Sequence, residues 1–349
     1  MSGEKPGKPN TERLFFREAI ARAVREEMRR NARVIVLGQD VGAFGGSYRE
    51  FDGLFAEFGP ARVRDTPVAE NAMVGVGVGL AAGGFRPLVS ITYMDFLMLG
   101  LDPLFNYGAK LRFKSAGRMT APLVVKTTAG AKGQGVAHSQ CIESWLMGVP
   151  GLKVVAPSNP ADAYLLMKAA LRETGPLVYV DHKRLFPGAG DVPLDEEVGA
   201  IGVAQILRAG TDVTLTAHSF MVRVALEAAQ RLADDGISCE VIDLRSLSPL
   251  DVETIARSAQ RTGALLTLEE GQLTCGVGAE VSARVAERIG PLRAARVGPL
   301  PAPVSSNPLL EAAVVPDAGR VVAAAKALLG ARFAAAAEDA IITNEGGGD

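Results

Sequence analysis

Short apolar runs alternate with amphipathic helical patterns over most of the chain, which predicts α/β layers around largely parallel sheets. In the first half, β-branched and other apolar runs predict strands at 34–37, 87–92, 123–127, 153–156 and 177–180. Apolar residues at helical spacing, beginning with Phe15 and Ala19, predict a first helix over 11–30. Further helices are expected at 67–83, 96–116, 143–147 and 160–172.

The same alternation returns after a stretch rich in Pro, Gly and acidic residues. We therefore expect two α/β domains at 14–186 and 205–331, joined by a linker at 187–204. A flexible tail is expected at 1–13 and a disordered one at 332–349. In the second domain, strands are expected at 212–216, 239–243, 264–268 and 295–297, and helices at 221–233, 251–261, 276–289 and 318–329.

Composition narrows the classes of function. The 349 residues are 48% hydrophobic and 22% charged, with a formal net charge of −2, so we expect a globular protein that binds no nucleic acid. No apolar stretch is long enough to cross a membrane, and residues 1–11 lack the apolar core of a signal peptide. The three cysteines are far apart, which indicates reduced thiols and no structural zinc. We expect a cytoplasmic protein.

Glu70 is the first candidate for chemistry. It lies just inside a helix expected to open with Thr66 and Pro67, where the helix dipole alone would favour a carboxylate. A carboxylate shielded from bulk water can also share a proton at neutral pH. We expect the apolar neighbours Val68, Ala72 and Met73 to provide that shielding.

His138 is the second candidate, because it lies in a loop after a predicted strand, where α/β proteins place their chemistry. An imidazole there could bind a carboxylate or pass a proton, although a hydrogen-bonded structural histidine fits the pattern as well. His182 and His218 also follow strands, and we expect both to be structural.

Glycines punctuate the helix after Glu70. Gly77, Gly79 and Ala82 imitate a dinucleotide-binding fingerprint, but such a turn should directly follow a buried strand, so we reject that interpretation. Gly75, Gly79 and Gly83 instead form one bare stripe on the helix. The stripe predicts close approach by another helix, which would offset the low helix propensity of glycine.

Together these segments resemble the β subunits of the two-component 2-oxo acid dehydrogenases, of the pyruvate, branched-chain 2-oxo acid and acetoin types. The likeness runs from about Leu14 to Leu329. Its signatures are 57–60 (EFGP), 65–70 (DTPVAE), 137–140 (AHSQ), 149–157 (VPGLKVVAP), 240–245 (EVIDLR), 248–251 (SPLD), 261–263 (RTG) and 276–280 (GVGAE).

The resemblance implies a transketolase-like pyrimidine-binding domain followed by a transketolase C-terminal domain, with thiamine diphosphate as cofactor. It implies that Glu70 activates the cofactor through the N1′ nitrogen of its aminopyrimidine, that Val68 and Phe96 contact the cofactor, and that His138 is the active-site histidine. His138 would orient the donor carboxylate or protonate the lipoyl sulfur.

The chain lacks the Gly-Asp-Gly…Asn motif that holds Mg²⁺ and the diphosphate in thiamine enzymes. By the resemblance, those groups are held by a separate E1 α subunit in an α2β2 heterotetramer with a β–β contact, and the acyl group passes to a lipoyl-bearing E2 acyltransferase. Details of the sequence lean toward the acetoin and pyruvate branches.

The family also implies a structural K⁺, bound by backbone carbonyls near Leu123, Ala170, Leu171 and Glu173. Glu173 and Gly175 stand where Asp and Asn are usual, so the sequence departs from the family at this site.

Two other functions stay open. A split transketolase would transfer a two-carbon ketol unit between sugars, but it would need basic and histidine residues for sugar phosphates, and histidine is scarce here. A non-catalytic scaffold would have no reason to keep Glu70, Phe96 and His138.

Overall fold

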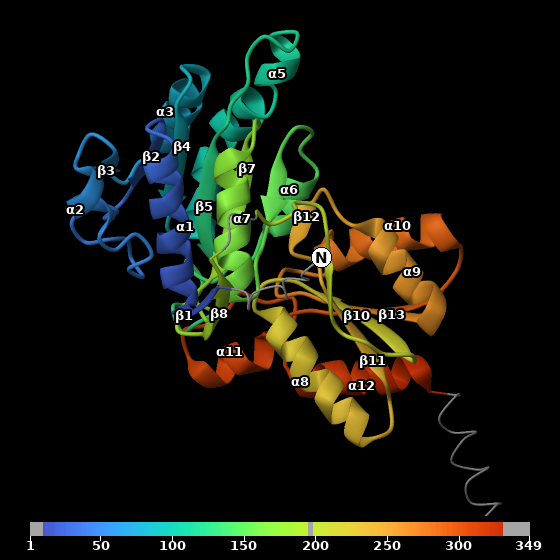
Figure 1. The fold of residues 1–349 in the computed structure, drawn as a ribbon. Coiled ribbons are helices and arrows are strands. Elements are labelled where there is room, and N and C mark those ends of the chain that lie inside the picture. Colours follow the sequence, from blue (N-terminus) through green and yellow to red (C-terminus); the bar gives the residue numbers. More distant parts are fainter. Residues whose placement is uncertain (1–9, 195–197, 331–349) are drawn as a thin grey trace, which may run out of the picture.

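The computed structural model describes residues 10–194 and 198–330, which form two α/β domains stacked one above the other (Figure 1). Residues 1–9 of the tail expected at 1–13, and the whole tail expected at 332–349, lie outside the described residues. Within the described ranges, no helix combines the length and the apolar character needed to cross a membrane.

The first domain is built on a seven-stranded sheet in the order β12-β6-β7-β5-β4-β2-β3. All neighbouring strands are parallel except β12, which pairs antiparallel to β6 and comes from the second half of the chain. Its strands are β2 (Val34–Gly38), β3 (Val63–Asp65), β4 (Arg86–Ile91), β5 (Val124–Ala129), β6 (Lys153–Val155), β7 (Leu177–His182) and β12 (Ser246–Ser248).

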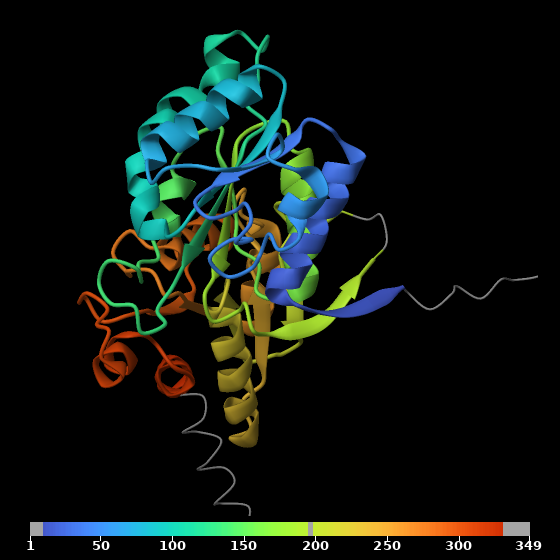
Figure 2. The same cartoon turned by 90° about the vertical axis from the view of Figure 1, so that its left-hand side faces the viewer.

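Helices cover both faces of this sheet, as Figure 2 shows from the side. Strands buried on both faces read as continuous apolar runs, which is why β2 is Val-Ile-Val-Leu-Gly with every residue buried. One face carries α1 (Phe16–Arg30) and α7 (Pro160–Arg172). The other carries α3 (Glu70–Ala82), α4 (Met94–Leu97), the 3₁₀ turn η1 (Met98–Gly100), the π-helix η2 (Pro103–Gly108), α5 (Leu111–Lys114) and α6 (Glu143–Met147).

The second domain has a five-stranded sheet in the order β14-β13-β10-β11-β9, parallel except for β9. Helices α8 and α12 pack on one face, whereas α9 and α10 share one continuous apolar core with the α3 side of the first domain. The elements are β9 (Gln205–Arg208), β10 (Val213–Ala217), α8 (Met221–Asp234), β11 (Cys239–Asp243), α9 (Val252–Thr262), β13 (Ala264–Leu268), α10 (Val277–Ile289), β14 (Arg293–Val297), α11 (Pro308–Val314) and α12 (Ala318–Leu329).

The two-domain α/β architecture is confirmed, but several expected elements are wrong. Residues 11–15 are not helical: they form β1 (Thr11–Phe15), which pairs antiparallel with β8 (Ala189–Pro193). The expected flexible tail is therefore ordered from Thr11, and the expected linker contains a strand. The pairing joins residues far apart in sequence, so local propensity could not reveal it.

The helix expected to open with Thr66 and Pro67 begins later, at Glu70. The Thr66 N–H donates to the Gly38 carbonyl and so prolongs the β3–β2 ladder, and a residue before proline favours extended backbone.

The single helix expected over 96–116 is broken into α4, η1, η2 and α5. Pro103 stands inside it and supplies no N–H for a helical hydrogen bond.

Candidate active site

The sequence-predicted site residues follow parallel strands that end at one edge of the seven-stranded sheet. Glu70 follows β3, Phe96 follows β4, and His138 follows β5. Because the strands are parallel, their carboxyl ends share one edge, which is where open α/β sheets bind ligands. The structure thus gathers residues that are far apart in the sequence.

Glu70 is buried, with 5% of its surface exposed, and it is the first residue of α3. Its Oε1 accepts a hydrogen bond of 3.3 Å from the Gln39 side chain, which follows β2. The free N–H groups at the start of α3 favour a negative charge at this position. Gln39 was not predicted, although its position directly after a buried strand is a usable signal.

The expected shielding of Glu70 by its apolar neighbours is wrong in part. Met73 is buried, but Val68 is 76% exposed and Ala72 is also exposed. Because the helix starts at Glu70, Val68 lies in the preceding turn and points away from the core. Glu70 is nevertheless buried within this chain, so the surrounding protein shields its carboxylate from water. Val68 is exposed and can contact another molecule.

Phe96 and His138 are in direct contact. The His138 ring makes edge-to-face contacts with Phe96, at 5.4 Å between centroids, and with Tyr93, at 5.1 Å. Aromatic groups favour this geometry. The structure therefore brings two predicted residues together and adds Tyr93, which sequence analysis missed despite its place just beyond β4.

The Tyr93 hydroxyl lies within a small polar network. It accepts hydrogen bonds from the Tyr48 hydroxyl at 3.2 Å and from the Gln134 side chain at 3.0 Å. Burial, followed by the hydrogen bond to Tyr93, raises the pKa of Tyr48 above its ordinary range, so Tyr48 stays protonated as a donor. Nothing local in the sequence around Tyr48 signals this contact.

A buried ion triad holds the loop that carries Tyr48. Lys126 Nζ lies 2.9 Å from Glu50 and 2.8 Å from Asp181, and all three side chains are fully buried. Burial alone would lower the pKa of Lys126, but the charges of Asp181 and Glu50 raise it to about 12. Glu50 also accepts from the Tyr48 backbone N–H, so the triad is continuous with the network.

His182 and His218 are both buried, as expected of structural histidines. The His182 ring lies 2.9 Å from Glu270 of the second domain, and its other nitrogen accepts from the Arg184 N–H. Burial opposes ionisation of Glu270, but His182, the Ala131 backbone N–H and Arg184 together hold the pKa of Glu270 below its ordinary value. Burial lowers the pKa of His218 to about 4, so this ring is neutral at pH 7.

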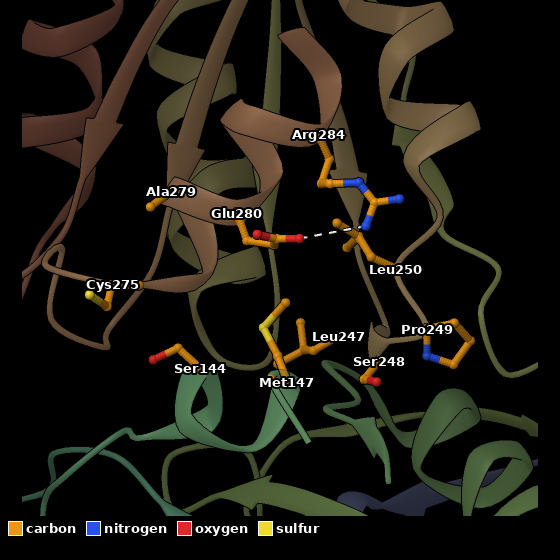
Figure 3. Close-up of a pocket in the computed structure, with 12 residues that line it drawn as sticks. Ser144, Met147, Leu247, Ser248, Pro249, Leu250, Cys275, Ala279, Glu280 and Arg284 are labelled. Carbon is orange, nitrogen blue, oxygen red and sulfur yellow. Dashed lines mark ion pairs between the residues drawn. The ribbon is translucent and has the colours of Figure 1, made fainter. Parts of the chain in front are cut away.

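A cavity of about 530 Å³ lies beside the His138 loop, between the domains. Val136 and Ser139 to Ile142 supply one wall, and Glu270 and the proline-rich segment 299–304 supply the other. A second cavity of about 600 Å³ is lined by Ser144, Cys275 and the Glu280–Arg284 ion pair, and it contains none of the predicted site residues (Figure 3). The first cavity is not lined by Val68, Glu70, Phe96 or His138 either, and it lies beside the candidate site only through the residues that flank His138 in the chain.

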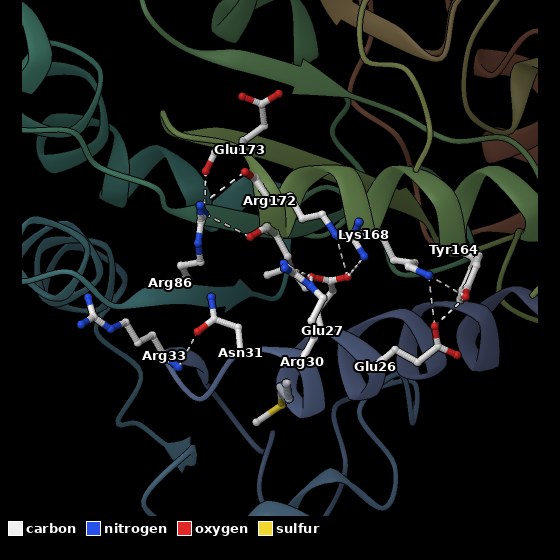
Figure 4. Close-up of polar contacts among 12 residues, drawn as sticks. Glu26, Glu27, Arg30, Asn31, Arg33, Arg86, Tyr164, Lys168, Arg172 and Glu173 are labelled. Atoms are coloured by element: carbon white, nitrogen blue, oxygen red, sulfur yellow. Dashed lines mark hydrogen bonds and ion pairs between the residues drawn. The ribbon is translucent and has the colours of Figure 1, made fainter. Parts of the chain in front are cut away.

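The carbonyls named for a K⁺ ion are already hydrogen-bonded. Leu123 accepts from Leu177 N–H, and Ala170 accepts from Glu173 N–H. The Arg86 guanidinium donates to the carbonyls of Leu171 and Glu173, and it supplies a positive charge at the end of α7 (Figure 4). These residues alone do not form a free cage for a cation, so we derive no function from K⁺, which stays a prediction.

Within residues 10–194 and 198–330, no group of three or more His, Cys, Asp or Glu side chains could hold a metal ion. The donor set around Glu70, Phe96 and His138 instead suits an aromatic, nitrogen-containing ring: one buried carboxylate for a ring nitrogen and aromatic surface for stacking. These residues fit the aminopyrimidine end of thiamine diphosphate.

Two family models match the chain: the transketolase pyrimidine-binding domain over residues 13–188 and the transketolase C-terminal domain over residues 202–321. Curated relatives include the pyruvate dehydrogenase E1 component subunit beta of Rhizobium meliloti (strain 1021), 40% identical over 90% of this chain and 70% of the relative. The 2-oxoisovalerate dehydrogenase subunit beta of Bacillus subtilis (strain 168) is 41% identical over 78% of this chain and 84% of the relative.

The acetoin:2,6-dichlorophenolindophenol oxidoreductase subunit beta of Cupriavidus necator is 38% identical, over 90% of this chain and 97% of the relative. Among solved structures, an inactive β4 tetramer of a split-gene transketolase is similar, with a TM-score of 0.75 and 27% identity. That likeness covers 90% of this chain and 98% of the other.

Proposed function

The chain belongs to the transketolase-like family of E1 β subunits of 2-oxo acid dehydrogenases, and from that premise we propose that it completes a thiamine diphosphate site shared with an α subunit. The enzyme so formed would cleave a pyruvate-like 2-oxo acid or acetoin oxidatively and pass the acyl group to a lipoyl disulfide of an E2 partner. The observation that carries the proposal is the buried Glu70 carboxylate, placed at the same sheet edge as Phe96 and His138.

Each of these side chains has a task that its environment suits. Glu70, desolvated and at a helix N-terminus, would share a proton with the far ring nitrogen of the cofactor, while Gln39 fixes its orientation. Phe96 would pack against the aminopyrimidine, and exposed Val68 would touch it from the turn before α3. His138 would hydrogen-bond the donor. When bound, thiamine diphosphate supplies the thiazolium ring that accepts the electron pair of the broken bond.

The contact with an α subunit is supported by the surface around Glu70. Val68, Val76 and Leu99 are 76%, 56% and 58% exposed, and they lie on α3 and the adjoining turns. A Cβ at Gly79 would meet nothing within 4 Å, so the glycine stripe is open at this position in this chain. An exposed apolar surface beside an incomplete site is typical of a subunit interface. The α subunit would hold Mg²⁺ and the diphosphate, for which this chain offers no motif.

The test is Glu70→Gln in the assembled α/β enzyme, with reduction of a dye such as 2,6-dichlorophenolindophenol as the readout. Turnover should fall by about 10²- to 10⁴-fold, because an amide cannot share the proton. The melting temperature should stay close to that of the wild type. Glu280→Gln, a surface change on α10, is the matched control and should keep full activity. Near-normal turnover by the Glu70 variant would defeat the proposal.

A split transketolase is the second candidate, favoured by the structural likeness to such a protein. Parallel assays with pyruvate, branched 2-oxo acids, acetoin and ketose phosphates separate the two. Turnover of ketose phosphate with an aldose acceptor, in the absence of dye, would favour ketol transfer.

A further inference from the structure

Tyr93 touches His138 and is itself held from several directions. Besides the edge-to-face contact with His138, its ring lies under the Lys183 ammonium, whose Nζ is 4.3 Å from the ring centroid. Lys183 is fully buried, and its Nζ has no hydrogen-bond partner within the described residues. A desolvated cation over an aromatic face is attracted more strongly than an exposed one, so Lys183 fixes the Tyr93 ring.

The Tyr93 hydroxyl reaches the His138 loop by a second route. Gln134, which donates to it, belongs to the same loop as His138, and Tyr48 ties it to the loop after β2. Tyr48 is anchored in turn by Glu50 of the buried triad and stacks on Phe186, with 4.5 Å between ring centroids. The hydroxyl is thus a junction between two loops that lack regular structure, and each loop end is attached to the rigid sheet.

From this arrangement we propose that Tyr93 is a positioning residue for His138: its ring sets the orientation of the imidazole, and its hydroxyl fixes the loop that carries the imidazole. Phe96 supplies the second aromatic wall, so the imidazole is held between two rings. Catalytic geometry depends on such support, because a displacement of about 1 Å can lower a rate by about 10²-fold. Only the expected effect on turnover rests on the proposed function, whereas the positioning of His138 does not.

The three histidines of the chain make the test direct. With ¹³C-labelled histidine, the full-length protein should give three ring signals, and His138→Asn identifies the one from His138. Tyr93→Leu removes the ring and should shift and broaden the His138 signal, while the signal of buried His218 stays in place. Tyr93→Phe keeps the ring and should leave a signal closer to the wild type.

In the assembled α/β enzyme, Tyr93→Leu should lower kcat by about 10- to 100-fold with little change in KM, because the chemical geometry is disturbed more than substrate binding. Tyr93→Phe should recover only part of that loss, because it keeps the ring beside His138 but removes the hydroxyl that fixes the loop. Tyr107→Leu, at an exposed tyrosine of η2 whose ring lies under the Lys114 ammonium, is the control and should change neither readout.

An unchanged His138 signal in folded Tyr93→Leu would overturn this inference whatever the enzyme does. Full activity of His138→Asn would instead defeat the role assigned to His138 under the proposed function, and the measured contact would stand. The two failures are therefore distinguishable.

Discussion

The two domains use the carboxyl edges of their parallel sheets differently. In the first domain, the Glu70 side chain makes one hydrogen bond among the described residues, Phe96 and His138 are half-buried, and Val68 projects into solvent. In the second domain, the carboxylates at the end of β11 and just beyond β13 are hydrogen-bonded within the chain. Asp243 accepts from Ser158 of the first domain, and Glu269 accepts from the first N–H groups of α10.

We call the carboxyl edge of the first sheet the binding edge, because its side chains are available to a ligand. The carboxyl edge of the second sheet is the docking edge, because it makes contacts within the chain. Asp243 and Glu269 at the second edge are held by hydrogen bonds within the chain, so these two carboxylates stabilise the fold. Among the described residues, His218 Nδ1 and Ser219 Oγ at this edge are buried without a hydrogen-bond partner. Polar groups at the first edge are less fully engaged and lie beside an apolar surface, as expected where a second molecule completes the site. The same sheet position therefore predicts function only when the partners of its side chains are known.

The largest effect is expected from a test that removes an ion pair at the docking edge. Arg245 donates to Asp162 of α7 across the domain boundary, at 2.9 Å from Nε, and both side chains are nearly buried. Arg245→Met should lower the free energy of unfolding by about 3–5 kcal/mol, because it leaves a buried carboxylate without its cation. Urea unfolding at pH 7 measures this.

Arg231→Met is the control for that experiment. Arg231 pairs with Glu227 on the exposed surface of α8, so its loss should cost less than about 1 kcal/mol. If Arg245→Met were equally mild, the second edge would not be a stabilising one, and the contrast with the Glu70 edge would disappear.

Sequence patterns predicted most elements of this fold because those elements are locally determined. Helix α7 runs over 160–172 as predicted, since Asn159 caps it and Pro160 occupies its first turn. The missed elements depend on distant partners: β12 is a three-residue strand that forms only by pairing with β6, and β8 forms by pairing with β1. No local pattern specifies such pairings.

The site divides in the same way. Glu70 and His138 were found because each lies within a family signature, and Phe96 was identified by the resemblance, just beyond the strand predicted at 87–92. Tyr48 and Lys183 were missed because their importance lies in what they touch, which is Tyr93 in both cases. The exposure of Val68 could not be foreseen either, since it depends on α3 beginning at Glu70.

A smaller effect concerns His218 at the docking edge. Its pKa falls from the ordinary 6.5 to about 4 in the folded protein because burial opposes the charged form. Between these values the unfolded chain binds a proton that the folded protein refuses, so stability is lost as pH falls from about 6.5 toward 4. At pH 5 this loss should be about 2 kcal/mol relative to pH 7.

His218→Asn should remove that contribution, because asparagine does not titrate. The measurement is the difference in unfolding free energy between variant and wild type at pH 7 and at pH 5, which cancels the titration of other groups. The variant should gain about 2 kcal/mol of stability relative to the wild type between pH 7 and pH 5. Without that gain, His218 would bind a proton in the folded protein as readily as in the unfolded chain.

The smallest expected effect has opposite signs in the isolated chain and in the complex. Gly79 lies mid-helix in α3 with open space around its missing Cβ, so Gly79→Ala should stabilise the isolated chain by about 0.5–1 kcal/mol. If the glycine stripe meets a helix of the α subunit, the added methyl group should weaken assembly. Gly77→Ala is the contrasting variant, since its Cβ would lie 2.7 Å from Val89 and should destabilise the chain itself. Melting temperature and titration with the α subunit separate the effects, and unchanged assembly by Gly79→Ala would place the interface elsewhere.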